Sequence, residues 1–204
     1  MRILVIGGAG FIGSHTVDEL LIRGHEIIVM DNLSKPVHLK GKPNYLQPEV
    51  EFIEGDLRDE RILLKCMKRV NAVYNFAAYQ DYLPDFSTYF DVNCVGTALL
   101  YELIVKHNLP ISKVIVASSQ AVAGEGLYKN SEGKYFTPNI RSNSQLEKGH
   151  WEIIDPSGGR ANWQKTPENV RNPQNQYGLS KLNQEDIALN IGKRYNIPSV
   201  AMRY

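Results

Sequence analysis

Residues 1–31 read MRILVIGGAGFIGSHTVDELLIRGHEIIVMD, and this stretch decides the fold expected for the chain. Residues 2–6 form a short apolar run of the kind that a buried parallel strand shows. Residues 11–23 place apolar side chains at helical spacing, and residues 27–30 form a second apolar run. The stretch therefore predicts a strand, a glycine-rich turn, a helix and a second strand.

The glycine-rich turn indicates a ligand. Gly8, Gly10 and Gly13 match G-x-G-x-x-G, while Gly7, Gly10 and Gly13 match a three-residue spacing. Glycine lets the backbone turn tightly and approach a pyrophosphate, whose charge is favoured at the N-terminus of a helix. Asp31 ends the second strand, where it can accept hydrogen bonds from an adenosine ribose and would repel the extra phosphate of NADP. We therefore predict an NAD site, the alternative being a glycine turn without a ligand.

The composition limits the class of protein. With 204 residues the chain is long enough for one large domain. Its 23 basic and 22 acidic residues give a net charge of +1, which offers no electrostatic argument for nucleic acid or an anionic membrane, so we expect a small-molecule partner. Cys66 and Cys94 form no C-x-x-C motif, and the five histidines lack ligand spacing, so we expect a reduced cytoplasmic setting and no metal site. No signal peptide or apolar run near ~18 residues is visible, which predicts a soluble protein.

The rest of the chain continues the alternation of strands and helices. Expected strands cover residues 50–54, 72–76, 114–117 and 198–202, and expected helices cover residues 59–69, 86–107 and 176–195. This order predicts an α/β fold, a Rossmann-type doubly wound parallel sheet formed by residues 1–204. Gly96 lies inside an expected helix and indicates tight helix packing, because glycine costs roughly 1 kcal/mol there.

Two segments break the alternation. The polar, proline-containing residues after Asp31 predict a surface loop. Residues 125–170 contain both tryptophans but no sustained period, so we expect an insertion or a long loop system there. Loops of that length inside a compact domain tend to be functional.

A second set of residues points to catalysis. Tyr177 and Lys181 stand at i and i+4, one turn apart on one helical face, so the lysine ammonium is expected near the phenol oxygen. A nearby cation favours phenolate, and a positive lysine together with an oxidised nicotinamide would lower the pKa of tyrosine from about 10 toward that of a useful general base. Ser119 follows the fifth strand at its carboxyl end, which is the ligand-binding edge of such sheets. A chance pair on a core helix is the alternative.

Seven motifs spread over almost the whole chain resemble one family. They are GGAGFIG (7–13), DNL (31–33), GDL (55–57), NFAA (75–78), DVNCVGT (91–97), VASSQAVAG (116–124) and YGLSK (177–181). Together they resemble the extended short-chain dehydrogenase/reductase family of NAD-dependent nucleotide-sugar epimerases and dehydratases. The insert, the stretch KPNYLQPEVEF and the approach PENVRNPQNQYGLSK resemble the dTDP-L-rhamnose 4-epimerase branch.

The resemblance implies a role for each matched residue. The cofactor-binding set is Gly7, Gly10, Phe11, Ile12 and Gly13 at the pyrophosphate, Asp31 and Asn32 at the adenosine ribose, Asp56 and Leu57 at the adenine, and Phe76, Ala77, Ala78 and Asn93 along the inner half. Ser119 resembles the catalytic serine or threonine and Tyr177 the base. Lys181 resembles the residue that binds the nicotinamide ribose and tunes the tyrosine, so Tyr177 and Lys181 also belong to the cofactor site.

The chain also departs from the family pattern. Gln120 and Ala121 stand where dehydratases carry an acid pair, which disfavours elimination chemistry. Asn75 replaces the usual histidine, and Val122-Ala123-Gly124 replaces V-Y-G, which predicts different packing near the nicotinamide. The cysteine pairs that the rhamnose branch often carries in its insert are absent at residues 130–133 and 155–158.

These features predict NAD-dependent epimerisation at C4 of a nucleotide-linked sugar by transient hydride transfer. Two alternatives stay open: an NAD-dependent sugar or alcohol oxidoreductase, and a catalytically silent NAD-binding fragment. The family continues past the R-Y seen at residues 203–204 into a substrate domain, so we expect that domain to be missing and this chain to hold NAD without epimerising a sugar. A homodimer is left open as the assembly.

Overall fold

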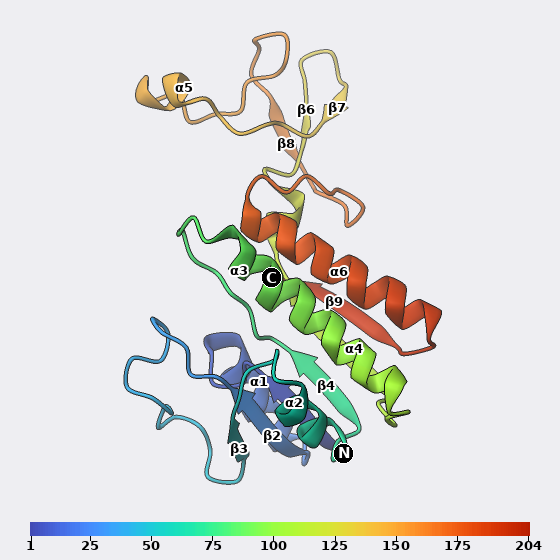
Figure 1. Cartoon of the computed structure of the whole chain (residues 1–204). Coiled ribbons are helices and arrows are strands. Elements are labelled where there is room, and N and C mark those ends of the chain that lie inside the picture. The colour runs from blue at the N-terminus through green and yellow to red at the C-terminus, as the bar shows by residue number, and fades with distance from the viewer.

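The computed structural model describes residues 1–204, and at its centre is a six-stranded parallel sheet (Figure 1). Its strands in spatial order are β3 (Glu51–Glu54), β2 (Glu26–Asp31), β1 (Arg2–Ile6), β4 (Ala72–Asn75), β5 (Lys113–Ser118) and β9 (Ser199–Arg203). The chain first runs outward from β1 to β3 and then returns to β4 on the other side of β1. The predicted Rossmann-type sheet is thereby confirmed, with its change of direction between β1 and β4.

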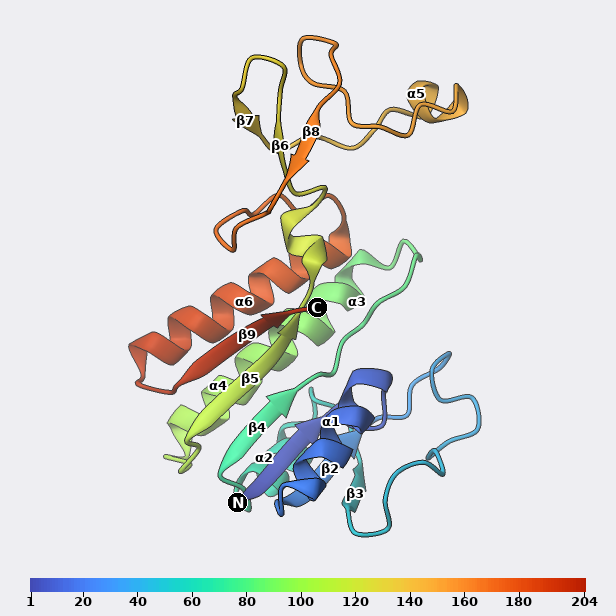
Figure 2. The ribbon, with the colours of Figure 1, turned by 180° about the vertical axis from the view of Figure 1, so that it is seen from behind.

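Helices cover the two faces of the sheet unequally. On one face lie α2 (Glu60–Met67), α4 (Gly96–Lys106) and α6 (Gln176–Arg194), as Figure 1 shows. On the other face α1 (Phe11–Ile22) lies over β1 and β2, and Figure 2 shows β5 and β9 without a helix in front of them. Burial on both faces explains why the first strand is a continuous apolar run.

The core consists of two layers, one on each side of the sheet. Leu4 and Ile6 of β1 pack into the layer shared with α2, α4 and α6. Ile3 and Val5, which point the other way, pack with the buried face of α1. The alternation follows from the two-residue period of a strand.

The expected helix over residues 86–107 is interrupted. It consists of α3 (Phe86–Phe90), a π-helical turn (Asp91–Val95) and α4, running as one rod. Such turns insert one residue into a helix and are frequent at functional sites. A Cβ on Gly96 would lie 2.7 Å from Cδ2 of Leu57, so this glycine is tightly packed, and its nearest neighbour belongs to the segment between β3 and α2 rather than to another helix.

Residues 125–170 form an insert that extends beyond the N-terminal end of α6 (Figure 1). It contains an antiparallel sheet of β7 (Tyr135–Phe136), β6 (Leu127–Lys129) and β8 (Asn162–Gln164), together with α5 (Asn143–Glu147). The sequence did not predict these strands, because runs of two or three residues show no periodicity. Trp151 and Trp163 are 66% and 78% exposed here.

A buried carboxylate joins two turns of the insert. Asp155, which is 3% exposed, accepts hydrogen bonds from the backbone N–H groups of Ser131, Ser157 and Gly159. The hydroxyls of both serines also donate to it. These hydrogen bonds, led by that from the Ser157 hydroxyl, lower the pKa of Asp155 to about 2 although burial alone would raise it.

The remaining features of the fold concern membrane-spanning helices, metal-binding groups and cysteines. None of the helices combines the length and the apolar character needed to cross a membrane. No three His, Cys, Asp or Glu side chains are grouped so that they could hold a metal ion. Cys66 and Cys94 are buried free thiols.

Candidate functional site

A cleft of about 290 Å³ opens at the carboxyl ends of β1, β2 and β4. This is the crevice that a doubly wound sheet forms where its strand order changes direction. Most of the predicted cofactor residues line it: Gly7, Gly10, Asp31, Asn32, Asp56, Leu57, Phe76, Ala77 and Ala78. The cleft also contains residues that the sequence analysis missed, including His38, Arg58 and Tyr79.

The floor of the cleft is backbone. Gly7 has a φ of +74°, and a Cβ there would lie 2.6 Å from the backbone nitrogen of Ala77. Gly10 precedes α1 without any side-chain cap, and the first intrahelical hydrogen bond runs from Ser14 N to Gly10 O at 2.9 Å. The N–H groups of residues 11–13 are therefore available to an anion, which is the fit that a pyrophosphate needs.

The side chains of Phe11 and Ile12 do not face the cleft. Phe11 is 80% exposed, and neither residue is among those that line the cavity. Contact with a pyrophosphate would therefore come through their backbone N–H groups. Gly13 likewise lies behind the loop, where a Cβ would collide with the carbonyl oxygen of Gly7.

Asp31 has structural partners as well as a place in the cleft. Its Oδ2 accepts from the N–H of Ala9 at 3.0 Å, and its Oδ1 accepts from the N–H of Leu33 at 2.9 Å. Nε2 of His38 lies 3.8 Å from Oδ1. The carboxylate thus links the glycine loop to the chain that leaves β2. His38 was missed because it belongs to a polar loop without any motif.

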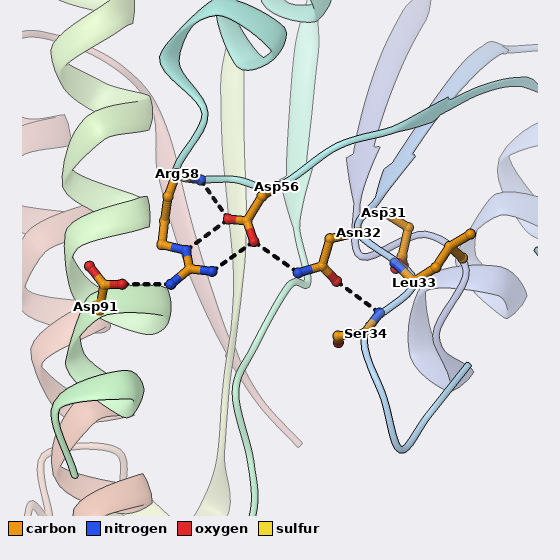
Figure 3. Close-up of polar contacts among 7 residues, drawn as sticks. All are labelled: Asp31, Asn32, Leu33, Ser34, Asp56, Arg58 and Asp91. Carbon is orange, nitrogen blue, oxygen red and sulfur yellow. Dashed lines mark hydrogen bonds and ion pairs between the residues drawn. The ribbon is translucent and has the colours of Figure 1, made fainter. Parts of the chain in front are cut away.

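Figure 3 shows a polar network at the neighbouring wall of the cleft. Asp56 accepts from N, Nε and a terminal nitrogen of Arg58 at 2.8–2.9 Å, and from Nδ2 of Asn32 at 2.9 Å. The other terminal nitrogen of Arg58 donates to Asp91 at 2.6 Å. The Arg58 guanidinium holds the pKa of Asp56 well below its usual range. Asp56 is therefore a fixed anionic acceptor. A basic residue two positions further along the chain, Arg58, is the feature of the sequence that could have indicated this ion pair.

Asn93 lies behind the cleft and supports its wall. The side chain is fully buried in the π-helical turn, where its Oδ1 accepts from the N–H of Tyr79 at 2.8 Å. Its Nδ2 donates to the carbonyl of Tyr79 at 3.1 Å and to Oγ of Ser180 at 2.9 Å. One amide thus joins the segment after β4 to helix α6.

Tyr177 lies at the start of α6, which packs against the turn that follows Ser119. Ser119 Oγ accepts from the N–H of Ala121 at 3.1 Å and begins a 3-10 turn over Gln120–Ala123. A Cβ on Gly178 would lie 2.6 Å from the carbonyl oxygen of Ala121, so the helix and this turn touch backbone to backbone. Burial raises the pKa of Tyr177, and the nearby Ser119 hydroxyl partly opposes that rise.

Lys181 differs from the sequence-based expectation. Its Nζ donates to Oε1 of Gln184 at 2.7 Å and lies 6.0 Å from the centre of the Tyr177 ring. Burial lowers the pKa of Lys181 to about 7, against the smaller effects of Cys94 and Glu185. In the protein alone, burial raises the pKa of Tyr177 and lowers that of Lys181, because it disfavours the charged form of both groups. The predicted lowering of the Tyr177 pKa requires the oxidised nicotinamide as well as Lys181, so it stays a prediction.

A buried ion pair fixes α6 to the sheet. Glu185 is 2% exposed, and its Oε1 accepts from Oγ of Ser118 at 2.5 Å and from Nε of Arg203 at 2.7 Å. A second guanidinium nitrogen donates to Oε2 at 2.8 Å. The helix that carries Tyr177 and Lys181 is thereby attached to both β5 and β9.

Comparison with known proteins agrees with this geometry. Residues 3–145 match the model of the NAD dependent epimerase/dehydratase family. A dTDP-L-rhamnose 4-epimerase of Burkholderia thailandensis is 31% identical over 194 residues, which cover 91% of this chain and 52% of the relative. The chain thus spans about half the length of this curated relative.

Solved structures give the same result. UDP-glucose 4-epimerase from Thermotoga maritima, solved with UDP-glucose, superposes with a TM-score of 0.73 at 26% identity. UDP-glucose 4-epimerase from Thermus thermophilus, solved with NAD, superposes with a TM-score of 0.69 at 28% identity. In both comparisons the match covers 100% of this chain and 55% of the other.

Proposed function

Because the chain belongs to the NAD-dependent epimerase/dehydratase family, we propose that its cleft binds NAD and that the enzyme containing it epimerises a nucleotide-linked sugar at C4. The observation that supports the proposal is the close contact between Gly178, at the start of α6, and Ala121, in the turn that follows Ser119. We expect this contact to hold the Tyr177 phenol near the Ser119 hydroxyl. Ser119 follows the carboxyl end of β5, at the same edge of the sheet as the cleft.

The cofactor site is assigned from the lining of the cleft. The pyrophosphate would bind the N–H groups of residues 11–13 and the adenosine ribose would bind Asp31 and Asn32. Leu57, Phe76, Ala77 and Ala78 would form the apolar walls, with Asp56 at the adenine and Asn93 behind. Asp31 favours NAD over NADP, because the extra phosphate on the adenosine ribose of NADP would face the Asp31 carboxylate, which is 7% exposed.

The catalytic roles follow from the chemistry of three side chains. Tyr177 would take the proton of the C4 hydroxyl, and Ser119 would donate a hydrogen bond to the same oxygen. Lys181 would supply positive charge beside them and bind the nicotinamide ribose. When bound, NAD would supply the acceptor for the C4 hydride and the donor that reduces the resulting keto sugar on its opposite face.

Epimerisation is favoured over elimination by the turn that follows Ser119. Gln120 and Ala121 have no side chain that could transfer a proton to a leaving water. The similarity to a dTDP-L-rhamnose 4-epimerase and to a UDP-glucose 4-epimerase supports a nucleotide sugar as substrate, the rhamnose branch being the more specific proposal.

The test is incubation of the purified chain with NAD and a panel of UDP- and dTDP-hexoses, followed by chromatography. Formation of the C4 epimer without net consumption of NAD, abolished in Tyr177→Phe, would support the proposal. Oxidised or reduced sugar formed with stoichiometric turnover of the cofactor would replace it by a plain oxidoreductase. Binding of NAD without conversion of any sugar is the result expected of the 204-residue chain without a substrate domain. It would identify this chain as an NAD-binding module, and the same assay on an enzyme that carries both the cleft and a substrate domain would then decide the epimerase proposal.

A second copy of the chain is proposed as partner. The outward faces of α4 and α6 lie in one layer (Figure 1), and Val95, Val105, Leu179 and Leu189 are exposed along this layer. Exposed apolar side chains on neighbouring helices are the kind of surface that an oligomer interface uses. Light scattering after gel filtration tests this, and a monomer at all concentrations would contradict it.

A further inference from the structure

A chain of buried polar side chains runs from Lys181 through α4 to β4. Lys181 Nζ donates to Oε1 of Gln184 at 2.7 Å, and Nε2 of Gln184 donates to Oγ1 of Thr97 at 2.9 Å. Nδ2 of Asn75 donates to the same hydroxyl oxygen at 3.1 Å. All four side chains are at most 1% exposed. Polar groups buried this deeply are retained with partners in fixed orientations.

The Thr97 hydroxyl sets the direction of the network. It donates its single proton to the carbonyl oxygen of Asn93 at 2.8 Å, so toward the two amides it can only accept. Gln184 must therefore turn its NH₂ group to Thr97. This leaves its carbonyl oxygen facing Lys181.

Gln184 is the sole hydrogen-bond acceptor of the Lys181 ammonium. Glu185 is committed to Ser118 and Arg203. The Cys94 thiol, on the π-helical turn, donates to the carbonyl of Ser180 at 3.3 Å. Asn75 turns its amide nitrogen to Thr97, and its Oδ1 is buried without a hydrogen-bond donor.

We propose that Gln184 is a positioning residue for Lys181. The Thr97 hydroxyl orients the Gln184 amide, and the Gln184 carbonyl oxygen then holds the Lys181 ammonium. An ammonium has three donors, so this arrangement leaves two N–H groups for the ribose hydroxyls of a dinucleotide. The part that concerns the dinucleotide rests on the proposed function. The part that concerns Gln184 and Lys181 does not.

The proposal has a direct readout in the titration of Lys181. The titratable groups that face its ammonium are Cys94 from the π-helical turn, with Tyr177 and Glu185 from α6 itself. None of them accepts a hydrogen bond from Nζ. Removing the Gln184 acceptor therefore leaves a buried cation without compensation and should lower its pKa further.

The experiment is an NMR titration of the Lys181 side chain in the 204-residue protein. Gln184→Met, which keeps the volume, should lower the Lys181 pKa by about one unit, the scale of a lost hydrogen bond to a charged group. Gln184→Glu should raise it. Gln164→Met, the same substitution in β8, is the matched control and should leave it unchanged.

Thr97→Val tests the aiming of Gln184 independently and serves if Gln184→Met does not fold. It should lower the Lys181 pKa, and Thr97→Ser, which keeps the hydroxyl, should restore it. Equal Lys181 pKa values in the wild type, Gln184→Met and Thr97→Val would overturn the proposal. Calorimetry should also show NAD affinity about tenfold lower in Gln184→Met. A wild type that fails to bind NAD would refute the proposed function, while the titration still decides the role of Gln184.

Discussion

Asp31 is both a candidate ligand and a structural residue. Its two oxygens accept backbone N–H groups from the glycine loop and from the turn after β2. A carboxylate oxygen has room for more than one donor, so these bonds leave capacity for ribose hydroxyls. The same side chain thus shapes the cleft and is the residue proposed to disfavour the extra phosphate of NADP.

Replacing Asp31 by alanine should weaken NAD binding at least about tenfold, because a charge-assisted acceptor and a support of the glycine loop are lost together. NADP binding should change less, so the preference for NAD should narrow. Calorimetry with both cofactors measures this, with Asp18→Ala on α1 as the control. An unchanged ratio of the two affinities would argue against Asp31 as the selective residue.

Tyr177→Phe removes the proposed base while keeping the ring. In the active protein, turnover should fall by at least ~10²-fold, the usual contribution of a general base, while NAD affinity is retained. Tyr195→Phe, at the other end of the same helix, is the control and should keep turnover. Steady-state kinetics and calorimetry on both variants measure the two effects, and full turnover in Tyr177→Phe would mean that another group moves the proton.

At the level of elements, the sequence was sufficient wherever a strand or helix is long and buried on a regular face. The apolar runs of β1 and β2 and the acid at the end of β2 were enough to place the glycine loop. The π-helical turn could not be predicted from the sequence, because its residues continue the helical pattern on either side. The network of Gln184 and Thr97 was missed for another reason: residues 87 positions apart meet only through the packing of α4 against α6.

Gly178→Ala should test the contact that brings α6 to Ser119. The added methyl would lie 2.6 Å from a carbonyl oxygen that cannot move without breaking the turn, so we expect about 1–3 kcal/mol of destabilisation. Chemical denaturation measures this loss. Asn183→Ala, five residues further along the same helix, should cost less than Gly178→Ala, and equal stability of both variants would contradict the tight contact.

The Asp155 turn predicts a pH dependence of the insert. Its pKa falls from 3.8 in the unfolded chain to about 2 in the folded one, so its stabilisation is complete above pH 3.8 and is lost as the pH falls through about 2. Hydrogen exchange of residues 127–164 at several pH values should show opening in that window. Asp155→Asn should flatten the dependence, and an identical profile in this variant would exclude Asp155 as its source.

In the whole molecule, buried hydrogen bonds connect the cleft to the helix that carries the candidate catalytic residues Tyr177 and Lys181. Asn93 contacts the segment beside the cleft and also α6, while Glu185 attaches α6 to β5 and β9. NAD bound to the folded state alone would stabilise the folded protein, by about 2.7 kcal/mol at a concentration of 100 times its Kd.

The position of the two tryptophans has a spectroscopic consequence. Both lie in the insert and are 66% and 78% exposed, so their emission should already resemble that of indole in water and change little when the sheet unfolds. Tyrosine is the useful probe of the sheet domain, since Tyr89 and Tyr101 are fully buried there. We expect NAD to raise the melting temperature measured by circular dichroism, while tryptophan fluorescence changes little across the same transition. A large tryptophan transition at the same temperature would contradict the exposed position of both tryptophans in the insert.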